Sequence, residues 1–260
     1  MHDSEINITF ASKIHKGRTN YNIMDDFKRT ADGYAYQYPR AAITTDCVIF
    51  GYDGYQLRVL LIRRGGDPFK GYWALPGGFL NMDESVEQCA FRELYEETGL
   101  EPDSLEQFGV FSALGRDPRG RTVSVAFYGL VRLAEVHGGD DAAEAQWFDP
   151  SELPDLAFDH FDIIKEAFEA LKRDIHYRPI GFNLLEQQFS IPQLQRLYES
   201  ILGVSFDRRN FQKKVLSLGI LNQTNNKEKA QRHRAGKLYT FNQERYNELR
   251  EENVGKLRSL

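Results

Sequence analysis

The sequence predicts an α/β (α+β) protein, in which helices flank a mixed sheet and a smaller helical domain with a β-hairpin follows. Strand-like and helix-like segments alternate through the first domain. Pro179 and Gly181 then interrupt the pattern, and the charge changes sign near them. Lys and Arg number 19 against 30 Asp and Glu before residue 180, and 14 against 8 from there on. We expect an N-terminal tail or arm over 1–39 and domains over 40–175 and 180–255.

Length and composition predict a soluble globular protein. The 260 residues suffice for two domains, and 41% are hydrophobic and 27% charged. No apolar run approaches the roughly 18 residues of a membrane span, and the acidic start does not match a signal peptide. Cys47 and Cys89 form no disulfide or metal-binding pattern. We therefore expect a cytoplasmic protein without a membrane partner.

The first domain contains four segments with the β-branched and aromatic composition of strands: 41–52, 56–64, 107–114 and 122–133. Asp53-Gly54 predicts a hairpin turn between the first two. Residues 161–172 predict a closing helix. In the N-terminal arm, residues 25–29 are compatible with the start of a short helix, but no pattern repeats there.

A helix is predicted between Gly78 and Gly99. Asp83 is the expected N-cap, with Glu84 in the first turn, where a negative charge suits the helix dipole. Val86, Ala90 and Leu94 recur at helical spacing and predict a buried stripe. Gly99 can take the left-handed conformation that ends a helix.

Three carboxylates share one face of this helix. Glu93, Glu96 and Glu97 stand at positions i, i+3 and i+4, where like charges repel by a few tenths of a kcal/mol per pair. A solvated acidic surface would explain them, but a hard divalent cation such as Mg²⁺ would also compensate the charge, because it prefers carboxylate and phosphate oxygens. We therefore treat the cluster as a candidate metal site.

The spacing around these residues decides between the two interpretations. Gly78 is followed after five residues by Glu84, and after seven more by the run Arg92-Glu93-Leu94-Tyr95-Glu96-Glu97-Thr98-Gly99-Leu100. Nine specified positions match a random window on the order of once in a billion times. The stretch resembles the Nudix box at every defining position, and the preceding Trp-x-Leu-Pro-Gly-Gly run is similar to that of Nudix proteins. The resemblance implies a Nudix αβα sandwich and a metal-dependent pyrophosphohydrolase.

The Nudix resemblance also implies roles for individual residues. Mg²⁺ (or Mn²⁺) is expected on the Gly77 carbonyl and on Glu93, Glu96 and Glu97, with Arg92 and Glu84 orienting these carboxylates. The late loop of the domain would supply a further carboxylate, from Glu144 as catalytic residue or from Asp141 beside the substrate; surface solvation is the competing interpretation.

A basic turn over residues 115–121 lies beside the expected site. Such a turn is usually plain surface, but guanidinium groups match phosphate oxygens. Arg116 and Arg119 are therefore candidate ligands of a diphosphate, and Gly78 is placed with them as a substrate contact.

The second domain begins with a capping box at Ser190 and Gln193, which predicts a helix over 193–202. Asp207 is the expected cap of a second helix over 208–218. Phe211, Val215 and Leu218 are its predicted buried residues. Two short strands are predicted over 220–224 and 237–241.

Two helices followed by a hairpin with a basic tip resemble a winged helix-turn-helix. Between residues 207 and 237, nine basic residues face two acidic ones, a charge that suits a DNA phosphate backbone. An accessory interaction domain is the alternative. The candidate DNA-binding residues are Arg208, Arg209, Asn210, Lys213, Lys214, Lys227, Lys229, Arg232 and Arg234.

The two halves together are similar to the Nudix-related transcriptional regulators of the NrtR type. The resemblance covers about residues 40–255 and includes the GRDPRGRTVSVAFY and LAFDH segments. It implies a regulator of NAD metabolism that binds ADP-ribose or a related nucleotide and, as a homodimer, a double-stranded DNA operator. Because the box is intact, cleavage of ADP-ribose to AMP and ribose 5-phosphate is also expected. A plain ADP-ribose pyrophosphatase with an accessory domain and a pentose-responsive regulator remain alternatives.

Overall fold

The computed structural model describes residues 27–30, 33–36, 38–139, 142–177, 180–227 and 236–248. The chain divides into two compact units, residues 1–41 and 42–260. In the first unit, β1 (Phe27–Thr30) pairs antiparallel with β2 (Gly33–Tyr36). The short helix considered for 25–29 is therefore wrong, because a stretch of that length cannot repay the cost of helix nucleation, whereas the hairpin supplies a pairing partner.

The second unit contains a six-stranded mixed sheet in the order β5-β4-β3-β7-β6, with β8 also paired to β4. Its strands are β3 (Ala42–Tyr52), β4 (Leu57–Arg64), β5 (Trp73–Ala74), β6 (Glu106–Phe111), β7 (Thr122–Arg132) and β8 (Ala142–Phe148). β3 and β7 run parallel along their whole length, and the other pairs are antiparallel. The predicted mixed sheet is confirmed, although β5 and β8 were not expected and β6 stops short of residue 114.

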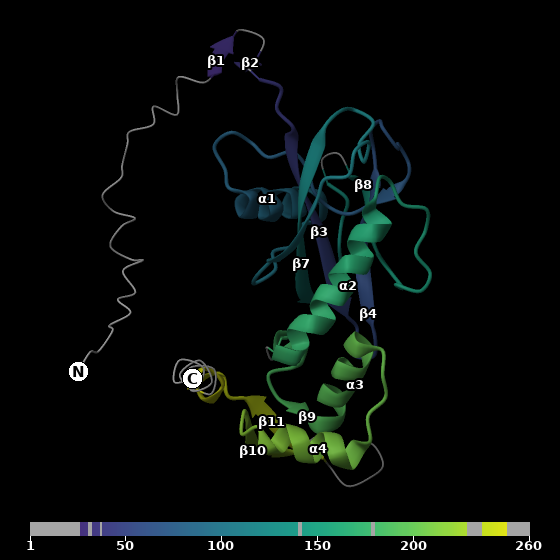
Figure 1. Ribbon diagram of the computed structural model, residues 1–260. Helices are drawn as coiled ribbons and strands as arrows, with labels where there is room; N and C mark the ends of the chain where they lie inside the picture. Colours follow the sequence, from purple (N-terminus) through teal and green to yellow (C-terminus); the bar gives the residue numbers. More distant parts are fainter. Residues whose placement is uncertain are drawn as a thin grey trace, which may run out of the picture. The chain divides into compact units, whose positions relative to one another are not determined.

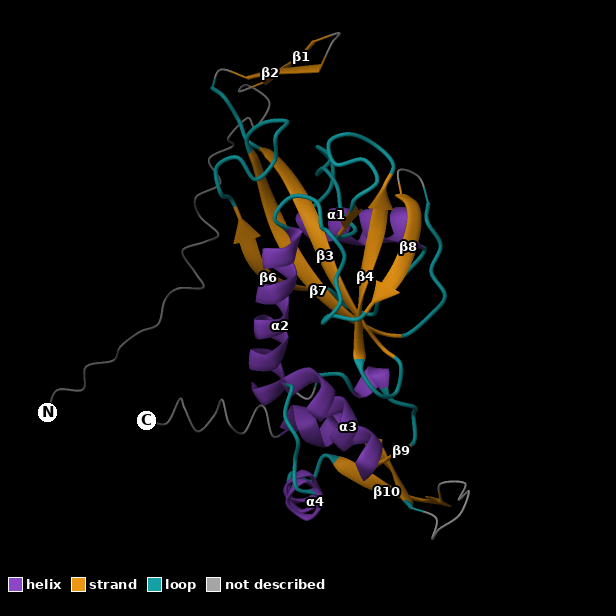
Figure 2. Cartoon of the chain, turned by 90° about the vertical axis from the view of Figure 1, so that its right-hand side faces the viewer, coloured by secondary structure: helices purple, strands orange, loops and turns teal. Residues whose placement is uncertain are grey.

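Helices cover both faces of this sheet (Figures 1 and 2). Side chains alternate along β3, so Cys47 and Ile49 pack in a cluster with α1 (Val86–Thr98), while Val48 and Phe50 pack in a cluster with α2 (His160–Tyr177). This three-layer arrangement is the predicted αβα sandwich.

The start of α1 differs from the prediction. Ser85, not Asp83, is the N-cap, and Ser85 and Gln88 form a reciprocal capping box. Glu84 lies before the helix, where its carboxylate accepts a hydrogen bond from the Asn81 N–H and binds Arg92. Gly99 ends the helix at φ 72°, in the expected left-handed conformation.

The C-terminal domain is a winged helix with a three-stranded antiparallel sheet ordered β10-β11-β9. A 3₁₀ turn, η1 (Phe182–Leu184), precedes β9 (Phe189–Ser190), α3 (Ile191–Leu202), α4 (Arg208–Ser217), β10 (Leu221–Lys227) and β11 (Lys237–Phe241). The capping box at Ser190 and the N-cap at Asp207 are both present. Leu218 was expected to be buried but is 48% exposed, because α4 ends at Ser217 and Leu218 is its cap.

The winged helix packs directly on the sandwich. Ile175 near the end of α2 and Leu197 of α3 belong to the same buried cluster as Phe50 of the sheet. At the junction, the Arg132 Nε donates to the Asn183 carbonyl at 3.2 Å, and the Asn183 amide donates to the Leu130 carbonyl at 3.3 Å. The two domains therefore share one apolar core. No helix in the described part of the chain has the length and apolar character needed to cross a membrane.

Candidate functional site

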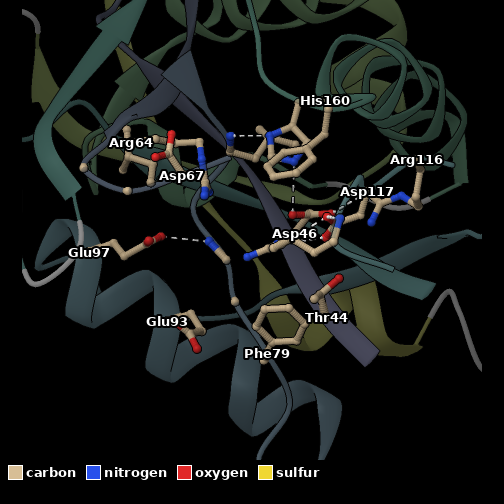
Figure 3. A pocket seen from close by; sticks show the side chains of 18 of the residues that line it. Thr44, Asp46, Arg64, Asp67, Phe79, Glu93, Glu97, Arg116, Asp117 and His160 are labelled. Carbon is tan, nitrogen blue, oxygen red and sulfur yellow. Dashed lines mark hydrogen bonds and ion pairs between the residues drawn. The ribbon is translucent and has the colours of Figure 1, made fainter. Parts of the chain in front are cut away.

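A cavity of about 400 Å³ opens at the edge of the sandwich, a size typical of small-molecule sites (Figure 3). Its walls come from β3, the end of β4 and the following loop, the Gly77-Gly78 segment, α1, the 115–121 turn and the start of α2. Segments far apart in the sequence are thus brought to one place by the sheet.

Two carboxylates of α1 form one wall. Glu97 is 8% exposed, and its Oε2 accepts a hydrogen bond from the Gly77 N–H at 2.8 Å. Glu93 packs against Gly78 so closely that a Cβ at Gly78 would lie 2.3 Å from the Glu93 carboxyl carbon. A side chain at Gly78 would therefore displace Glu93.

Arg92 organises the remaining carboxylates. Its guanidinium forms two hydrogen bonds with Glu84, at 2.9 and 2.7 Å, and its Nη1 contacts Glu93 at 2.7 Å and Glu96 at 2.9 Å. Glu96 does not line the cavity. The expected face of three equivalent carboxylates is therefore divided: Glu93 and Glu97 face the cavity, whereas Glu96 is held at its outer side by Arg92.

The same arrangement separates the pKa values of these groups. Burial raises the pKa of Glu97 to about 8, and the nearby Glu93 carboxylate adds to the shift. Burial also raises the pKa of Glu93, against the opposing effect of Arg92. Hydrogen bonding to Arg92 lowers the pKa of Glu84 to about 2. Ionisation of Glu93 and Glu97 is thus disfavoured unless a further positive charge enters the cavity.

This donor set fits a hard divalent cation. Mg²⁺ is commonly held by one or two carboxylates together with substrate phosphates rather than by a full protein cage. Glu93 and Glu97 supply two such carboxylates beside Gly77. In the described residues, no group of three or more His, Cys, Asp or Glu side chains is gathered in metal-binding geometry, so substrate or solvent oxygens would have to complete the coordination.

Guanidinium groups also line the cavity. The Cζ atoms of Arg64 and Arg119 lie 5.0 and 5.6 Å from the centre of the Phe158 ring, and Arg119 is also 4.9 Å from that of Phe79. Arg119 is 41% exposed and pairs with the buried Asp117 at 2.8 Å. Arg119, which the sequence predicted to contact phosphate, thus presents its guanidinium group at the surface of the cavity.

Arg116 has a different environment from the one predicted. Its side chain is 5% exposed, and it forms a two-pronged pair with Asp159, at 2.9 and 2.6 Å, and a contact of 3.2 Å with Asp46. The guanidinium is therefore engaged within the wall, and its geometry favours a positioning role over the direct diphosphate contact expected from sequence.

His160 completes this buried network. Its Nδ1 accepts a hydrogen bond from the Leu75 N–H at 2.8 Å, so the ring proton lies on Nε2, which is 3.5 Å from Asp46. Burial lowers the pKa of His160 and favours the neutral ring. His160 is accordingly a packing and hydrogen-bonding residue rather than a metal ligand.

The structure does not bring Glu144 into the cavity. It lies within β8 rather than in a loop, its side chain is 50% exposed, and its nearest charged partner is Arg63 at 3.9 Å. The strand pairing to β4 fixes this position, which argues against a catalytic role. Asp141, the other candidate from this region, lies outside the described residues.

Sequence reasoning missed several cavity residues. Asp46 was detectable, because a carboxylate within the otherwise apolar strand 41–52 must find a partner when both faces of the sheet are covered. Arg64 and Phe158 gave no such indication, since an arginine at a strand end and a phenylalanine before a helix are ordinary surface and core residues.

The predicted DNA-binding residues on α4 form an exposed basic face: Arg208, Arg209, Asn210, Lys213 and Lys214. Phe211 and Val215 point into the core, as expected. The backbone of Lys227 ends β10, while Lys229, Arg232 and Arg234 lie outside the described residues.

Comparison with known protein families gives two matches. Residues 41–167 match the NUDIX domain, and residues 181–241 match the NrtR DNA-binding winged helix domain.

Individual proteins are similar to this chain over part or most of its length. The ADPR responsive transcriptional repressor NtrR of Acinetobacter baylyi is 34% identical over 209 residues, which cover 78% of this chain and 83% of that protein. The ADP-ribose pyrophosphatase of Methanocaldococcus jannaschii is 50% identical over 109 residues, covering 42% of this chain and 64% of that enzyme. The crystal structure of Shewanella oneidensis NrtR complexed with a 27mer DNA superposes with a TM-score of 0.66 at 32% identity, covering 79% of this chain and 95% of that one.

Proposed function

This chain belongs to the NrtR family, in which a Nudix domain is joined to a winged-helix DNA-binding domain, and from that membership we propose that it is a transcriptional regulator controlled by ADP-ribose. ADP-ribose or a related nucleoside diphosphate would bind in the cavity, and α4 would bind a double-stranded DNA operator. The observation that carries the proposal is a cavity lined by both carboxylates and guanidinium groups, in a domain that shares its core with a winged helix.

The cavity chemistry supports a diphosphate ligand. Arg119 and Arg64 place positive charge on the Phe158 side, while Glu93 and Glu97 suit a cation that would itself bind phosphate oxygens. A diphosphate would contact both such a cation and the Arg119 guanidinium. The similar repressor from Acinetobacter baylyi is described as ADPR responsive, which favours ADP-ribose among such ligands.

A pyrophosphohydrolase activity is a second candidate function. Glu93 and Glu97, with the Gly77 carbonyl, would hold Mg²⁺ or Mn²⁺, and Arg92 would keep Glu93 in place through its 2.7 Å contact. When bound, the ion would polarise phosphorus and acidify a water. The observation that favours this activity is the pair of cavity-facing carboxylates beside Gly77. Cleavage would yield AMP and ribose 5-phosphate.

Two elements are placed to couple the cavity to DNA binding. α2 begins with His160 in the cavity wall, and its Ile175 lies in the core shared with the winged helix. β3 carries Asp46 in the cavity and ends at the hairpin of Tyr55, whose ring lies 5.9 Å from the Arg196 guanidinium of α3. Ligand binding that shifts either element would change the position of the winged helix. A coupling of this kind typically changes affinity about 5- to 150-fold.

The experiment measures three properties of the full chain: ADP-ribose affinity, AMP release with Mg²⁺, and binding to DNA from upstream of its own gene. For the wild type we expect DNA affinity to change on addition of ADP-ribose. Glu97→Gln should abolish AMP release, while DNA affinity without ligand stays within about threefold, since the winged helix carries it. The control is Glu87→Gln, the same change at an exposed position on the same helix.

The outcomes separate the candidate functions. DNA binding without an effect of ADP-ribose would contradict the regulator proposed here. AMP release without specific DNA binding would identify a plain pyrophosphatase with an accessory domain. Thermal stabilisation by a pentose but not by ADP-ribose would favour the sugar-responsive regulator, although a pentose carries no phosphate for the Arg119 guanidinium.

A further inference from the structure

Thr44 has a buried hydroxyl without a hydrogen-bond partner. In the part of the chain that the structure describes, its Oγ1 is the buried side-chain polar atom for which no protein partner exists. The residue is 7% exposed and lines the cavity. Because nearly all buried polar groups in native proteins are paired, an unpaired hydroxyl at a cavity wall indicates a partner from outside the chain.

The position does not require a hydroxyl for the fold. Valine has the shape of threonine and suits a β-strand, and it would avoid the cost of burying an unpaired polar group. The neighbouring Thr45 provides the contrast. It points to the other face of β3, is fully buried, and its Oγ1 lies 3.4 Å from the Cys89 sulfur. A threonine hydroxyl on this strand is thus paired on the α1 side and unpaired on the cavity side.

The surroundings of Thr44 identify the part of the ligand it faces. Thr44 forms an isolated β-bridge with Phe79, and the Arg119 guanidinium lies over the Phe79 ring. Figure 3 shows Thr44 beside Phe79, with Glu97 on the opposite side of the cavity. The Phe79 ring offers a flat surface suited to a nucleobase or sugar, whereas the Arg119 guanidinium and the Glu97 side suit phosphates and a cation.

We propose that Thr44 is a specificity-determining residue whose hydroxyl forms a hydrogen bond with a polar atom of the nucleoside half of the ligand, held beside Phe79. This inference rests on the proposed binding of ADP-ribose. It assigns the two ends of the cavity: the nucleoside lies at the Thr44 end, and the diphosphate reaches toward Glu93 and Glu97. The unpaired hydroxyl of the free protein becomes paired when the ligand binds.

The test is Thr44→Val in the full chain, with Thr45→Val as the matched control. Calorimetric titration with ADP-ribose should give a Kd raised roughly tenfold for Thr44→Val, the loss expected for one hydrogen bond in a dry site. Its Tm without ligand should equal or exceed that of the wild type, because the unpaired hydroxyl is gone. Thr45→Val should do the reverse, with a lower Tm and an unchanged Kd. Thr44→Ser, which keeps the hydroxyl, should restore the affinity.

The two halves of the ligand test the orientation. AMP carries the nucleoside, and ribose 5-phosphate does not. Thr44→Val should weaken the binding of AMP and leave that of ribose 5-phosphate unchanged. A defect confined to ribose 5-phosphate would overturn the assignment.

If Thr44→Val bound ADP-ribose with wild-type affinity, the proposal would be overturned. That result would mean that the Thr44 hydroxyl is paired with water and not with the ligand. No binding of ADP-ribose by the wild type would instead refute the proposed function, and this inference with it.

Discussion

Replacement of Glu97 by glutamine should stabilise the metal-free protein at neutral pH. Glu97 is 8% exposed, and burial raises its pKa from 4.5 to about 8. The folded state therefore holds a proton that the unfolded state releases. The resulting loss of stability is absent below pH 4.5, increases between pH 4.5 and about 8, and is constant above that. Glutamine has the same shape and no charge, so it escapes this loss.

The magnitude follows from the size of the shift. One pKa unit corresponds to about 1.4 kcal/mol, so the ionisable Glu97 costs roughly 4 kcal/mol at pH 7.5 and about 1 kcal/mol at pH 5. The glutamine oxygen can still accept the Gly77 hydrogen bond, while its buried amide group costs about 1–2 kcal/mol at either pH. The net gain is therefore about 2–3 kcal/mol at pH 7.5 and near zero or slightly negative at pH 5.

Urea unfolding of the wild type and of Glu97→Gln, in the presence of a chelator at pH 5 and pH 7.5, measures the difference between their free energies of unfolding. Other titrating groups affect wild type and variant equally. The pH dependence of the difference between their free energies of unfolding therefore reports on Glu97 alone. We expect the gain from Glu97→Gln to be larger by roughly 3 kcal/mol at the higher pH. An equal effect at the two values would show that Glu97 is not held in a desolvated environment.

Three further substitutions test other parts of the structure. Gly78→Ala should reduce Mg²⁺-dependent AMP release at least about 100-fold, because its Cβ would lie 2.3 Å from the Glu93 carboxyl carbon; circular dichroism should show a retained fold. His160→Asn preserves an acceptor for the Leu75 N–H. The lowered pKa of His160 makes the wild type lose stability as pH falls below about 6.5, and urea unfolding at pH 7.5 and 5.5 should show this loss missing in the variant. Lys213→Ala should weaken DNA binding and reduce the slope of log K against log salt by about 1, measured by fluorescence anisotropy.

The sandwich was predictable because its local patterns agree with its packing. The β-branched and aromatic composition of segment 41–52 and the helical recurrence of Ala90 and Leu94 both correspond to residues that are buried in the structure. The start of α1 was misplaced because Asp83 and Ser85 are both good caps. The choice between them depends on Glu84, which is held by Arg92 from the next turns of the helix and so cannot join the first turn.

The cavity wall was less predictable, because its partners are distant in sequence. Arg116 resembled a free phosphate ligand in the sequence, yet its partners Asp159 and Asp46 lie 43 and 70 residues away. No local pattern reports such a pairing. Glu144 was misplaced for the same reason: its exposure follows from the pairing of β8 with β4, a contact that residue periodicity over seven positions did not reveal.

The buried charges beside the cavity explain why Arg116 is paired with carboxylates of the protein. Asp46 and Asp159 are together compensated by one guanidinium, that of Arg116, while the neutral His160 adds no charge. Burying an anion without a partner costs several kcal/mol, so Arg116 is committed to the wall and cannot also serve a ligand. Arg119 has a single carboxylate partner, Asp117, and remains partly exposed. A phosphate can therefore bind Arg119 without leaving two buried carboxylates unpaired, as it would at Arg116. Loss of Arg119 should accordingly weaken ADP-ribose binding more than loss of a direct phosphate contact at Arg116.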